Sequence, residues 1–342
     1  MDNTQNHEEL SDELPYTIDF FTPADAPGVV ALFRAVYGEN YPVKEVYDPV
    51  ALMNQEKTGD AYRLVARAPS NEVVGHISIY RSSPPNPLLY EAGCLMIRHD
   101  YRQTDLSFTL FSALSTHLIS KYTIRYIWGE AVCNHLFTQQ SVFREGFIET
   151  ALEMDLMPAS SYAAPGSQSI GGRVSALTVF RLIDYLPQKI YVPSCYDETI
   201  RFLYAPIGDG CTFIRSDAPL PSGDTVGTVQ TFSEAGVARF TIDAVGTDFG
   251  PWIERNCMLA EKQGAQVIQF FIRMNTPAIG VVTDILQRNR FFIGGILPCW
   301  FGEDGFLMQK RIGTPFFEGT HVYTKRAGKI KEIVQNDWDV RR

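Results

Sequence analysis

The sequence Glu91–Leu118, EAGCLMIRHDYRQTDLSFTLFSALSTHL, decides how the first half of the chain is interpreted. The apolar run that ends at Ile97 is typical of a strand, and the apolar residues after Ser107 recur at helical spacing. A short polar turn therefore leads a strand directly into the first turn of a helix. Such a turn exposes backbone N–H groups at the positive end of the helix dipole, which suits a phosphate or pyrophosphate.

Further elements are predicted around this stretch. Before it, the patterns predict a strand at 16–20, a helix that begins at Thr22 and ends at Gly38, a short helix at 49–55, and strands within 61–68 and 72–82. After it, they predict a strand at 126–132, a helix at 136–144, and strands within 146–158 and 173–184. The Ser-, Ala- and Gly-rich segment 159–172 is interpreted as a mobile loop.

The second half of the chain repeats this order. Strands are predicted within 211–216, 225–233 and 237–245, then a helix at 249–263, a strand at 267–274, a helix at 277–288 and a final hairpin at 292–311. Both halves share a late pattern of strand, Asn, helix, aromatic strand and Pro, with Asn134, Phe147 and Pro158 in one and Asn275, Phe292 and Pro298 in the other. We interpret this as a diverged duplication.

The predicted fold class is α+β, a mixed and mostly antiparallel central sheet flanked by helices and duplicated in two halves. The predicted domain ranges are a disordered acidic N-terminus at 1–14, a first domain at 15–184, a connector at 185–207 and a second, degenerate domain at 208–342. The connector is proline-rich around one short helix.

Composition excludes several classes of protein. Hydrophobic residues make up 45% of the 342 residues and charged residues 20%, a mix that excludes a wholly disordered or fibrous chain. The net charge of −9 argues against a nucleic-acid partner, because such proteins concentrate positive charge. No apolar run approaches the ~20 residues of a membrane helix, and the start of the chain is acidic and polar, so we expect a cytoplasmic protein without a membrane partner.

The six cysteines form no C-x-x-C pair and no His–Cys cluster with zinc spacing, so we expect reduced thiols and no metal site. Cys94 and Cys133 lie on strands that would flank a bound thioester, which leaves a covalent acyl-cysteine route as a minor alternative.

The polar turn resembles the pyrophosphate loop of the GNAT superfamily of N-acetyltransferases, which reads Arg/Gln-x-x-Gly-x-Gly/Ala after a strand. Tyr101 matches the tyrosine that usually precedes this loop, and Arg102 matches its first position. The element order from Tyr16 to Asp184 is similar to that family, as is the ending Phe143-Arg144-Glu145-Gly146-Phe147. The resemblance implies a GNAT-like fold, and with the duplication it suggests a tandem form whose second domain lacks the loop and is degenerate.

The resemblance also implies that the chain binds acetyl-CoA as cosubstrate. The residues implied to contact it are Ile97, Arg102, Gln103, Thr104, Asp105, Leu106, Ser107 and Asn134. In this interpretation Asn134 contacts the pantetheine arm or a bound water, and its alternative role is to cap the helix that follows.

Two positions of the loop depart from the family pattern, because Asp105 and Ser107 replace its glycines. A carboxylate at position 105 would repel phosphates if it faced them. The alternative is that Asp105 turns outward and caps the next helix. A third departure is Val142, where members of the family often place a tyrosine that protonates the leaving thiolate.

The implied mechanism is direct attack of an amine on the acetyl thioester, with backbone N–H groups of Cys94–Ile97 stabilising the oxyanion. The amine must first lose a proton, which requires a general base. Glu91 lies at the spacing of the glutamate base in histone-type members, and Glu130 in the next strand is the second candidate. For each glutamate the alternative is a solvated or ion-paired strand residue.

We therefore expect an acetyl-CoA-dependent N-acetyltransferase with a small-molecule or protein amine as acceptor, and we consider a homodimer as its assembly. The alternative is a non-catalytic GNAT-like binding or regulatory module whose cofactor loops have decayed, which the departures at Asp105, Ser107 and Val142 favour.

Overall fold

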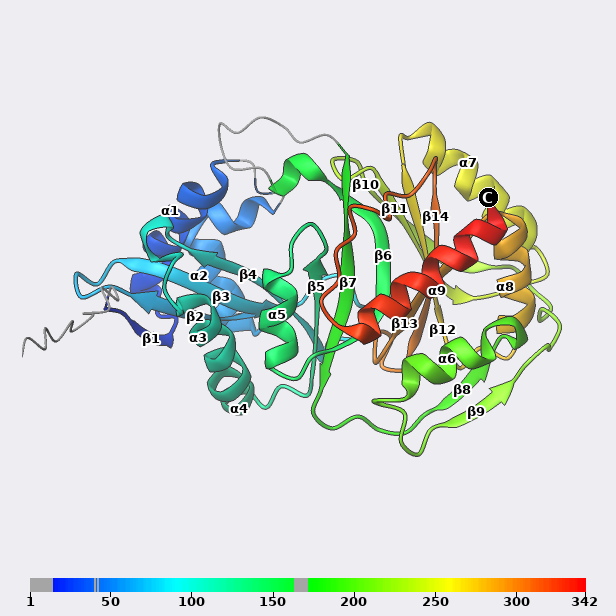
Figure 1. Ribbon diagram of the computed structural model, residues 1–342, viewed down its shortest axis with the longest axis horizontal. Helices are drawn as coiled ribbons and strands as arrows, with labels where there is room; N and C mark the ends of the chain where they lie inside the picture. The colour runs from blue at the N-terminus through cyan, green and yellow to red at the C-terminus, as the bar shows by residue number, and fades with distance from the viewer. Residues whose placement is uncertain (1–14, 40, 42, 163–171) are drawn as a thin grey trace, which may run out of the picture. The chain divides into compact units, whose positions relative to one another are not determined.

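The computed structural model describes residues 15–39, 41, 43–162 and 172–342. Its contacts divide the chain into two compact units, drawn in Figure 1. Unit 1 contains residues 1–78 and 94–121, and unit 2 contains residues 79–93 and 122–342. The boundaries of these units differ from the predicted domain ranges 15–184, 185–207 and 208–342. The predicted ranges describe a duplication in the sequence, and they remain predictions. The range 1–14 and most of the predicted loop 159–172 lie outside the described residues.

Unit 1 contains the N-terminal strands and helices of the first half. Its elements are β1 (Thr17–Phe20), α1 (Ala26–Tyr37), α2 (Pro49–Thr58), β2 (Ala61–Arg67), β3 (Val73–Tyr80), β4 (Leu89–Ile97), α3 (Leu106–Ala113) and α4 (Ile119–Tyr122), of which β3, β4 and α4 continue into unit 2. The strands are hydrogen-bonded in the order β1-β2-β3-β4. Short 3-10 turns lie at Pro23–Asp25, Lys44–Tyr47 and His99–Tyr101, and one π-helical turn lies at Leu114–Leu118.

The predicted end of the first helix at Gly38 is confirmed, whereas Thr22 precedes the 3-10 turn Pro23–Asp25 and α1 itself begins at Ala26. Asp25 accepts hydrogen bonds from the backbone N–H and the hydroxyl of Thr22, both at 2.7 Å, which forms a capping box on the turn that leads into α1. Gly38 ends α1 with a φ of 62°, a left-handed conformation that favours glycine. The apolar face of α1 buries Val29, Val30 and Phe33 in the core of this unit.

Unit 2 contains the remaining strands and helices. They are β5 (Tyr126–Val132), α5 (Phe137–Arg144), β6 (Ile148–Pro158), β7 (Arg173–Leu182), β8 (Lys189–Val192), α6 (Asp197–Tyr204), β9 (Thr212–Arg215), β10 (Val226–Phe232), β11 (Val237–Ala244), α7 (Phe249–Lys262), β12 (Val267–Arg273), α8 (Ile279–Arg288), β13 (Phe292–Leu297), β14 (Gly305–Arg311) and α9 (Lys325–Arg341). Short 3-10 turns lie at Ala159–Tyr162 and Ser194–Tyr196.

The large sheet of unit 2 has the order β5-β7-β6-β13-β14-β12-β11-β10 and is mostly antiparallel. The parallel pairs are β11 with β12, and β5 with the first residues of β4. Strands β8 and β9 form a separate parallel pair. The predicted α+β class, with a mixed and mostly antiparallel sheet flanked by helices, is confirmed. None of the helices in the described ranges combines the length and apolar character that crossing a bilayer requires.

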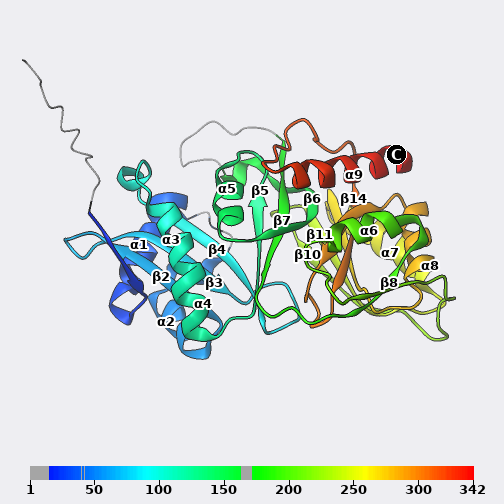
Figure 2. The same cartoon turned by 60° about the horizontal axis from the view of Figure 1, so that its bottom comes forward.

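Helix α9 was not predicted from the sequence. Thr324 caps it, because its hydroxyl accepts a hydrogen bond from the backbone N–H of Ala327 at 2.9 Å. The helix lies across β6 and β13, and α6 also contacts β13 (Figures 1 and 2). It thus covers the place where strands from the two halves of the sequence meet.

The two halves meet at a close backbone approach between β6 and β13. Gly295 lies opposite Ala151 and has a φ of 144°. A Cβ at this position would meet the Thr150 carbonyl oxygen and would lie 2.5 Å from the Cα of Ala151. The hydroxyl of Thr150 donates to the carbonyl of Ile296 at 2.8 Å beside this contact. Only glycine therefore allows both the backbone conformation and the approach.

We predict that Gly295→Ala lowers the free energy of unfolding by roughly 3 kcal/mol or more, because it adds a backbone clash to an unfavourable φ. Gly313→Ala is the matched control, since Gly313 has a φ of 95° but no atom within 4 Å of an added Cβ. We expect the control to lose about 1 kcal/mol. Urea unfolding of both variants measures the difference, and equal losses would contradict the assigned role of the close approach.

Candidate functional site

The predicted anion loop lies in unit 1, between the 3-10 turn at His99–Tyr101 and the start of α3. Arg102 and Gln103 are exposed, and the Arg102 Nε–H donates to the carbonyl of Ile97 at 3.3 Å. The Thr104 hydroxyl donates to the Tyr101 carbonyl at 2.7 Å and accepts the N–H of Leu106 at 3.2 Å. The loop therefore presents a guanidinium and an amide to solvent, while Thr104 occupies the first N–H of the helix.

Asp105 occupies the N-cap position of α3, but its side chain makes no capping hydrogen bond. The predicted capping role is therefore wrong. The hydroxyl of Tyr16 donates to the Asp105 carboxylate instead, and it also lies 3.3 Å from the Thr109 hydroxyl. A phenol distant in sequence thus holds the carboxylate that replaces the first loop glycine, a contact that helix propensity does not reveal.

The loop ends in buried residues of α3. Leu106 is fully buried, and Ser107, at the second glycine position of the pattern, is 8% exposed. Ile97, at the other side of the turn, is also buried at the end of β4. These three residues form the buried side of the loop, and its exposed residues are Arg102, Gln103 and Asp105.

Strand β4 is irregular at Cys94. This residue has a φ of 53°, which is a strained backbone conformation for a residue other than glycine. Its carbonyl accepts a hydrogen bond from His76 Nδ1 at 2.8 Å, and its Sγ lies 3.4 Å from the Tyr41 hydroxyl. Burial lowers the pKa of His76 to about 3, so the ring is neutral and Nδ1 is the donor. The irregularity is therefore fixed by a buried hydrogen bond.

Both predicted catalytic glutamates lie in unit 2. Glu91 and Glu130 are partly buried, on β4 and β5. Glu91 lies opposite Trp128 in the parallel β4–β5 ladder, and Glu130 follows Trp128 on the same face of β5. The Tyr80 hydroxyl donates to Glu91 Oε1 at 2.7 Å. The structure therefore brings the two candidates to one face of the sheet.

A third carboxylate, Glu153 of β6, continues this face and is 2% exposed. It accepts hydrogen bonds from the Thr178 hydroxyl at 2.7 Å and from the Gln269 amide. Arg239 of β11 lies with its Nη2 4.0 Å from Glu153 Oε2. Sequence reasoning missed these residues, although each polar residue interrupts an apolar strand, as in VARFTIDA around Arg239.

Burial and mutual repulsion change the ionisation of the two candidates. Burial raises the pKa of Glu91, and Glu153 raises it further, while hydrogen bonds from Ser82 and Tyr80 and the charge of Arg239 oppose this. Burial raises the pKa of Glu130 well above its usual range, assisted by Glu153 and Glu91 and opposed by Arg239. The pKa values of both carboxyl groups are therefore shifted toward the pH range in which a general base works.

Two other sequence-predicted positions lie beyond β5. Asn134 is exposed in the turn before α5, and Leu136 occupies the N-cap of that helix, so the alternative capping role of Asn134 is wrong. Val142 is buried within α5. Cys133 is fully buried, and burial raises the pKa of its thiol to about 12, which disfavours it as a nucleophile.

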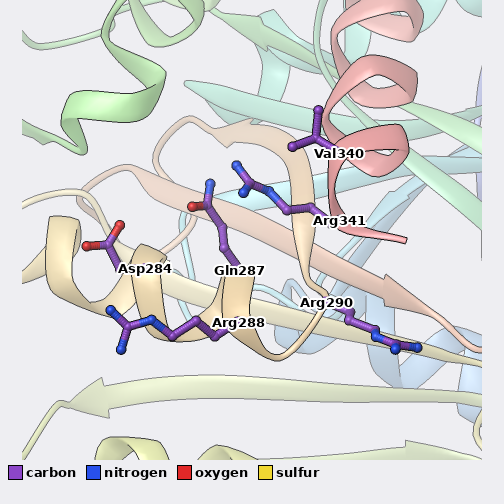
Figure 3. A pocket seen from close by; sticks show the side chains of 6 residues that line it. All are labelled: Asp284, Gln287, Arg288, Arg290, Val340 and Arg341. Atoms are coloured by element: carbon purple, nitrogen blue, oxygen red, sulfur yellow. The ribbon is translucent and has the colours of Figure 1, made fainter.

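An open hollow of about 540 Å³ lies elsewhere in unit 2, between α8 and the C-terminal end of α9 (Figure 3). In Figure 3 the side chains of Arg288 and Arg290 point in different directions. None of the sequence-predicted site residues borders it. The lining residues are Asp284, Gln287, Arg288, Arg290, Val340 and Arg341.

Comparison with known proteins finds similarity in structure alone. No family model and no curated protein matches the sequence. The ribosomal-protein-S5-alanine acetyltransferase from Vibrio fischeri is 11% identical, covers 49% of this chain and 93% of its own, and has a TM-score of 0.38. The ribosomal-protein-S18-alanine N-acetyltransferase from Escherichia coli is 13% identical, covers 50% and 96%, and has a TM-score of 0.38.

The spermidine N-acetyltransferase from Vibrio cholerae, solved with CoA and spermine, is 11% identical, covers 49% of this chain and 95% of its own, and has a TM-score of 0.37. Each of these similarities extends over about half of this chain.

We predict that the Glu130→Gln variant gains stability relative to the wild type as the pH rises from 5 to 8. Because the folded-state pKa of Glu130 is raised, the wild type loses stability above the unfolded-state pKa, by about 1.4 kcal/mol for each unit of pKa difference. The amide variant has no proton to lose at this position and escapes that loss. Chemical unfolding at both pH values measures the effect. The exposed Glu254→Gln is the control, and an equal pH dependence in the two variants would refute the prediction.

Proposed function

We propose that this chain is an acetyl-CoA-dependent N-acetyltransferase that acetylates an amine, with Glu91 as general base. The observation that carries the proposal is the raised pKa of a partly buried Glu91 on β4, the strand that leads into the anion loop. A second, independent support is the loop itself, with Arg102 at its first position and a helix N-terminus at its end.

Glu91 would take the proton from the acceptor ammonium. An amine has a pKa of about 10, and a carboxylate of ordinary pKa is a poor base for it. Burial raises the pKa of Glu91 and so improves the match. The hydrogen bond from Tyr80 holds the side chain in place. Glu130, whose pKa is raised further, remains the second candidate for the same role.

Strand β4 would also supply donors to the oxyanion. The conformation at Cys94 interrupts the regular strand, and the His76 hydrogen bond fixes it. A fixed backbone supports catalysis because its N–H groups need no reorganisation when charge develops. We assign this role to backbone N–H groups of Cys94–Ile97.

Acetyl-CoA would supply the activated acetyl group as a thioester. Its phosphates would lie against Arg102, Gln103 and the start of α3, since these are the loop's donors of hydrogen bonds. The hydrogen bond from Tyr16 gives the Asp105 carboxylate a partner within the protein, which moderates the repulsion expected from that position. The donor set thus fits the coenzyme despite the missing glycines.

The alternative function is a GNAT-like binding or regulatory module without catalysis. The departures at Asp105 and Ser107, together with Val142 in place of the expected tyrosine, favour it. The burial of Val142 and Ser107 means that neither side chain can be exposed without a local rearrangement.

We predict that acetyl-CoA and free coenzyme A raise the thermal unfolding midpoint by several degrees, whereas ADP alone has a smaller effect. A ligand at one hundred times its Kd adds about 2.7 kcal/mol of stability. Arg102→Ala should weaken coenzyme binding by about tenfold or more, because it removes a charge-assisted hydrogen bond. The exposed Lys57→Ala in the same unit should not. A folded wild type without any coenzyme-specific shift would favour the binding-module alternative.

We predict that Glu91→Gln lowers kcat/KM for acetyl transfer by at least a hundredfold, the lower end of the usual effect of removing a general base. Release of the coenzyme thiol with a lysine peptide, an amino sugar and a polyamine as acceptors measures the rate. The coenzyme-induced thermal shift should persist, and Glu254→Gln should retain activity. Transfer that is detectable and unaffected by Glu91→Gln would assign the proton to Glu130 or to water.

A further inference from the structure

We propose that Arg239, from the second half of the sequence, controls how Glu91 and Glu130 hold a proton and thereby acts as a positioning residue for the base. The catalytic consequence rests on the proposed function, whereas the control of the proton does not. The groups involved come from five strands, namely Tyr80 of β3, Glu91 of β4, Glu130 of β5, Glu153 of β6 and Arg239 of β11. We call these carboxylates and Arg239 the charged row.

Strand register places the first part of the row on one face of the sheet. Glu91 lies opposite Trp128, and Glu130, two residues further along β5, lies opposite Thr178 of β7. Paired residues share a face, and so do alternate residues of one strand. The Thr178 hydroxyl then donates to Glu153 Oε1 at 2.7 Å. The partly buried Glu91 and Glu130 therefore lie on the same face of the sheet as the buried Glu153.

The second part of the row is formed by Arg239 and its neighbour Gln269, both from the second half of the sequence. Arg239 lies opposite Gln269 in the parallel β11–β12 pair, and its Nε–H donates to Gln269 Oε1 at 3.0 Å. The Gln269 amide in turn donates to Glu153 Oε2, the oxygen that lies 4.0 Å from Arg239 Nη2. Gln269 thus joins the guanidinium to the carboxylate through its amide.

Aromatic rings surround the guanidinium. Its central carbon lies 4.8 Å from the ring centre of Phe271, 5.4 Å from that of Phe232 and 6.0 Å from that of Trp300. The Trp300 ring packs 4.9 Å from that of Trp128. Arg239 is 7% exposed, so solvent screens its charge only weakly. Its field therefore extends along the row to Glu91 and Glu130.

The charges of the row do not balance. It contains three carboxyl groups and only one guanidinium, that of Arg239. Glu153 is surrounded by donors, from Thr178 and Gln269, which is the environment of a carboxylate. The excess negative charge therefore falls on Glu91 and Glu130, and a proton bound by either carboxyl group relieves the repulsion between them.

Arg239 and Glu153 act on this proton with opposite signs. The guanidinium lowers the pKa of Glu91 and of Glu130, and Glu153 raises the pKa of both. Loss of Arg239 would therefore hold the proton on the pair to higher pH and leave less free base near neutral pH. The second half of the chain thus sets the pH range in which a base of the first half can act.

The test is a carboxyl titration by NMR of the full chain, labelled with 13C at the glutamate side-chain carboxyl. Glu91→Gln and Glu130→Gln assign the two resonances. We expect both to titrate above ordinary glutamate in the wild type. Arg239→Gln should move their midpoints up by about 1 to 3 pH units, Glu153→Gln should move them down, and Arg239→Lys should remain close to the wild type because it keeps the charge.

A second neutral variant keeps the test independent of a folding loss. If Arg239→Gln does not fold, Arg239→Met removes the same charge, keeps an apolar stem among the aromatic rings, and should move the midpoints up in the same way. Glutamates with ordinary midpoints in the wild type, or midpoints that do not move when the charge of Arg239 is removed, would overturn the proposal. This outcome does not depend on enzyme activity.

The activity arm separates this proposal from the proposed function. Where acetyl transfer is measurable, the acid limb of its pH profile should move to higher pH in Arg239→Gln and to lower pH in Glu153→Gln, in step with the NMR midpoints. Shifted NMR midpoints in a protein that transfers no acetyl group would uphold the charged row and refute the acetyltransferase. A pH profile that stays fixed while the midpoints move would refute the positioning role.

Discussion

The close backbone approach between β6 and β13 is the constraint on which much of unit 2 depends. At Gly295 the two strands meet without room for a side chain, and α9 covers the junction. Strands from both halves of the sequence consequently share one sheet. Because a sheet face is continuous across paired strands, the junction allows side chains of β11 and β12 to reach carboxylates of β6.

The charged row shows what this continuity does chemically. Burying three carboxylates beside one guanidinium is unfavourable in a low dielectric medium unless hydrogen bonds and shared protons compensate. Thr178 and Gln269 provide the hydrogen bonds for Glu153, while Glu91 and Glu130 lie at the more exposed end. A buried polar cluster that is satisfied at one end and titratable at the other is typical of a functional site rather than of a core.

Much of the local structure could be predicted from the sequence. Gly38 ends the first helix, Thr22 caps the 3-10 turn that leads into it, and the polar turn after Ile97 does lead a strand into α3. These signals are local, since capping and glycine conformations involve residues a few positions apart. Helix α9 was missed because its stability comes from packing on β6 and β13 rather than from an amphipathic pattern of its own.

The sequence by itself determined the class of fold and the polar turn between a strand and a helix, because strand and helix periodicity depends only on neighbouring residues. The two glutamates considered as base came from the resemblance to the GNAT superfamily and remain predictions. The tertiary structure alone decided that Tyr16 binds Asp105 and that Arg239 and Gln269 lie beside Glu153. The Tyr16–Asp105 contact joins residues 89 positions apart in the chain, and the Gln269–Glu153 contact joins residues 116 positions apart. Strand order and register bring them together, and neither is encoded in the local pattern of any single strand.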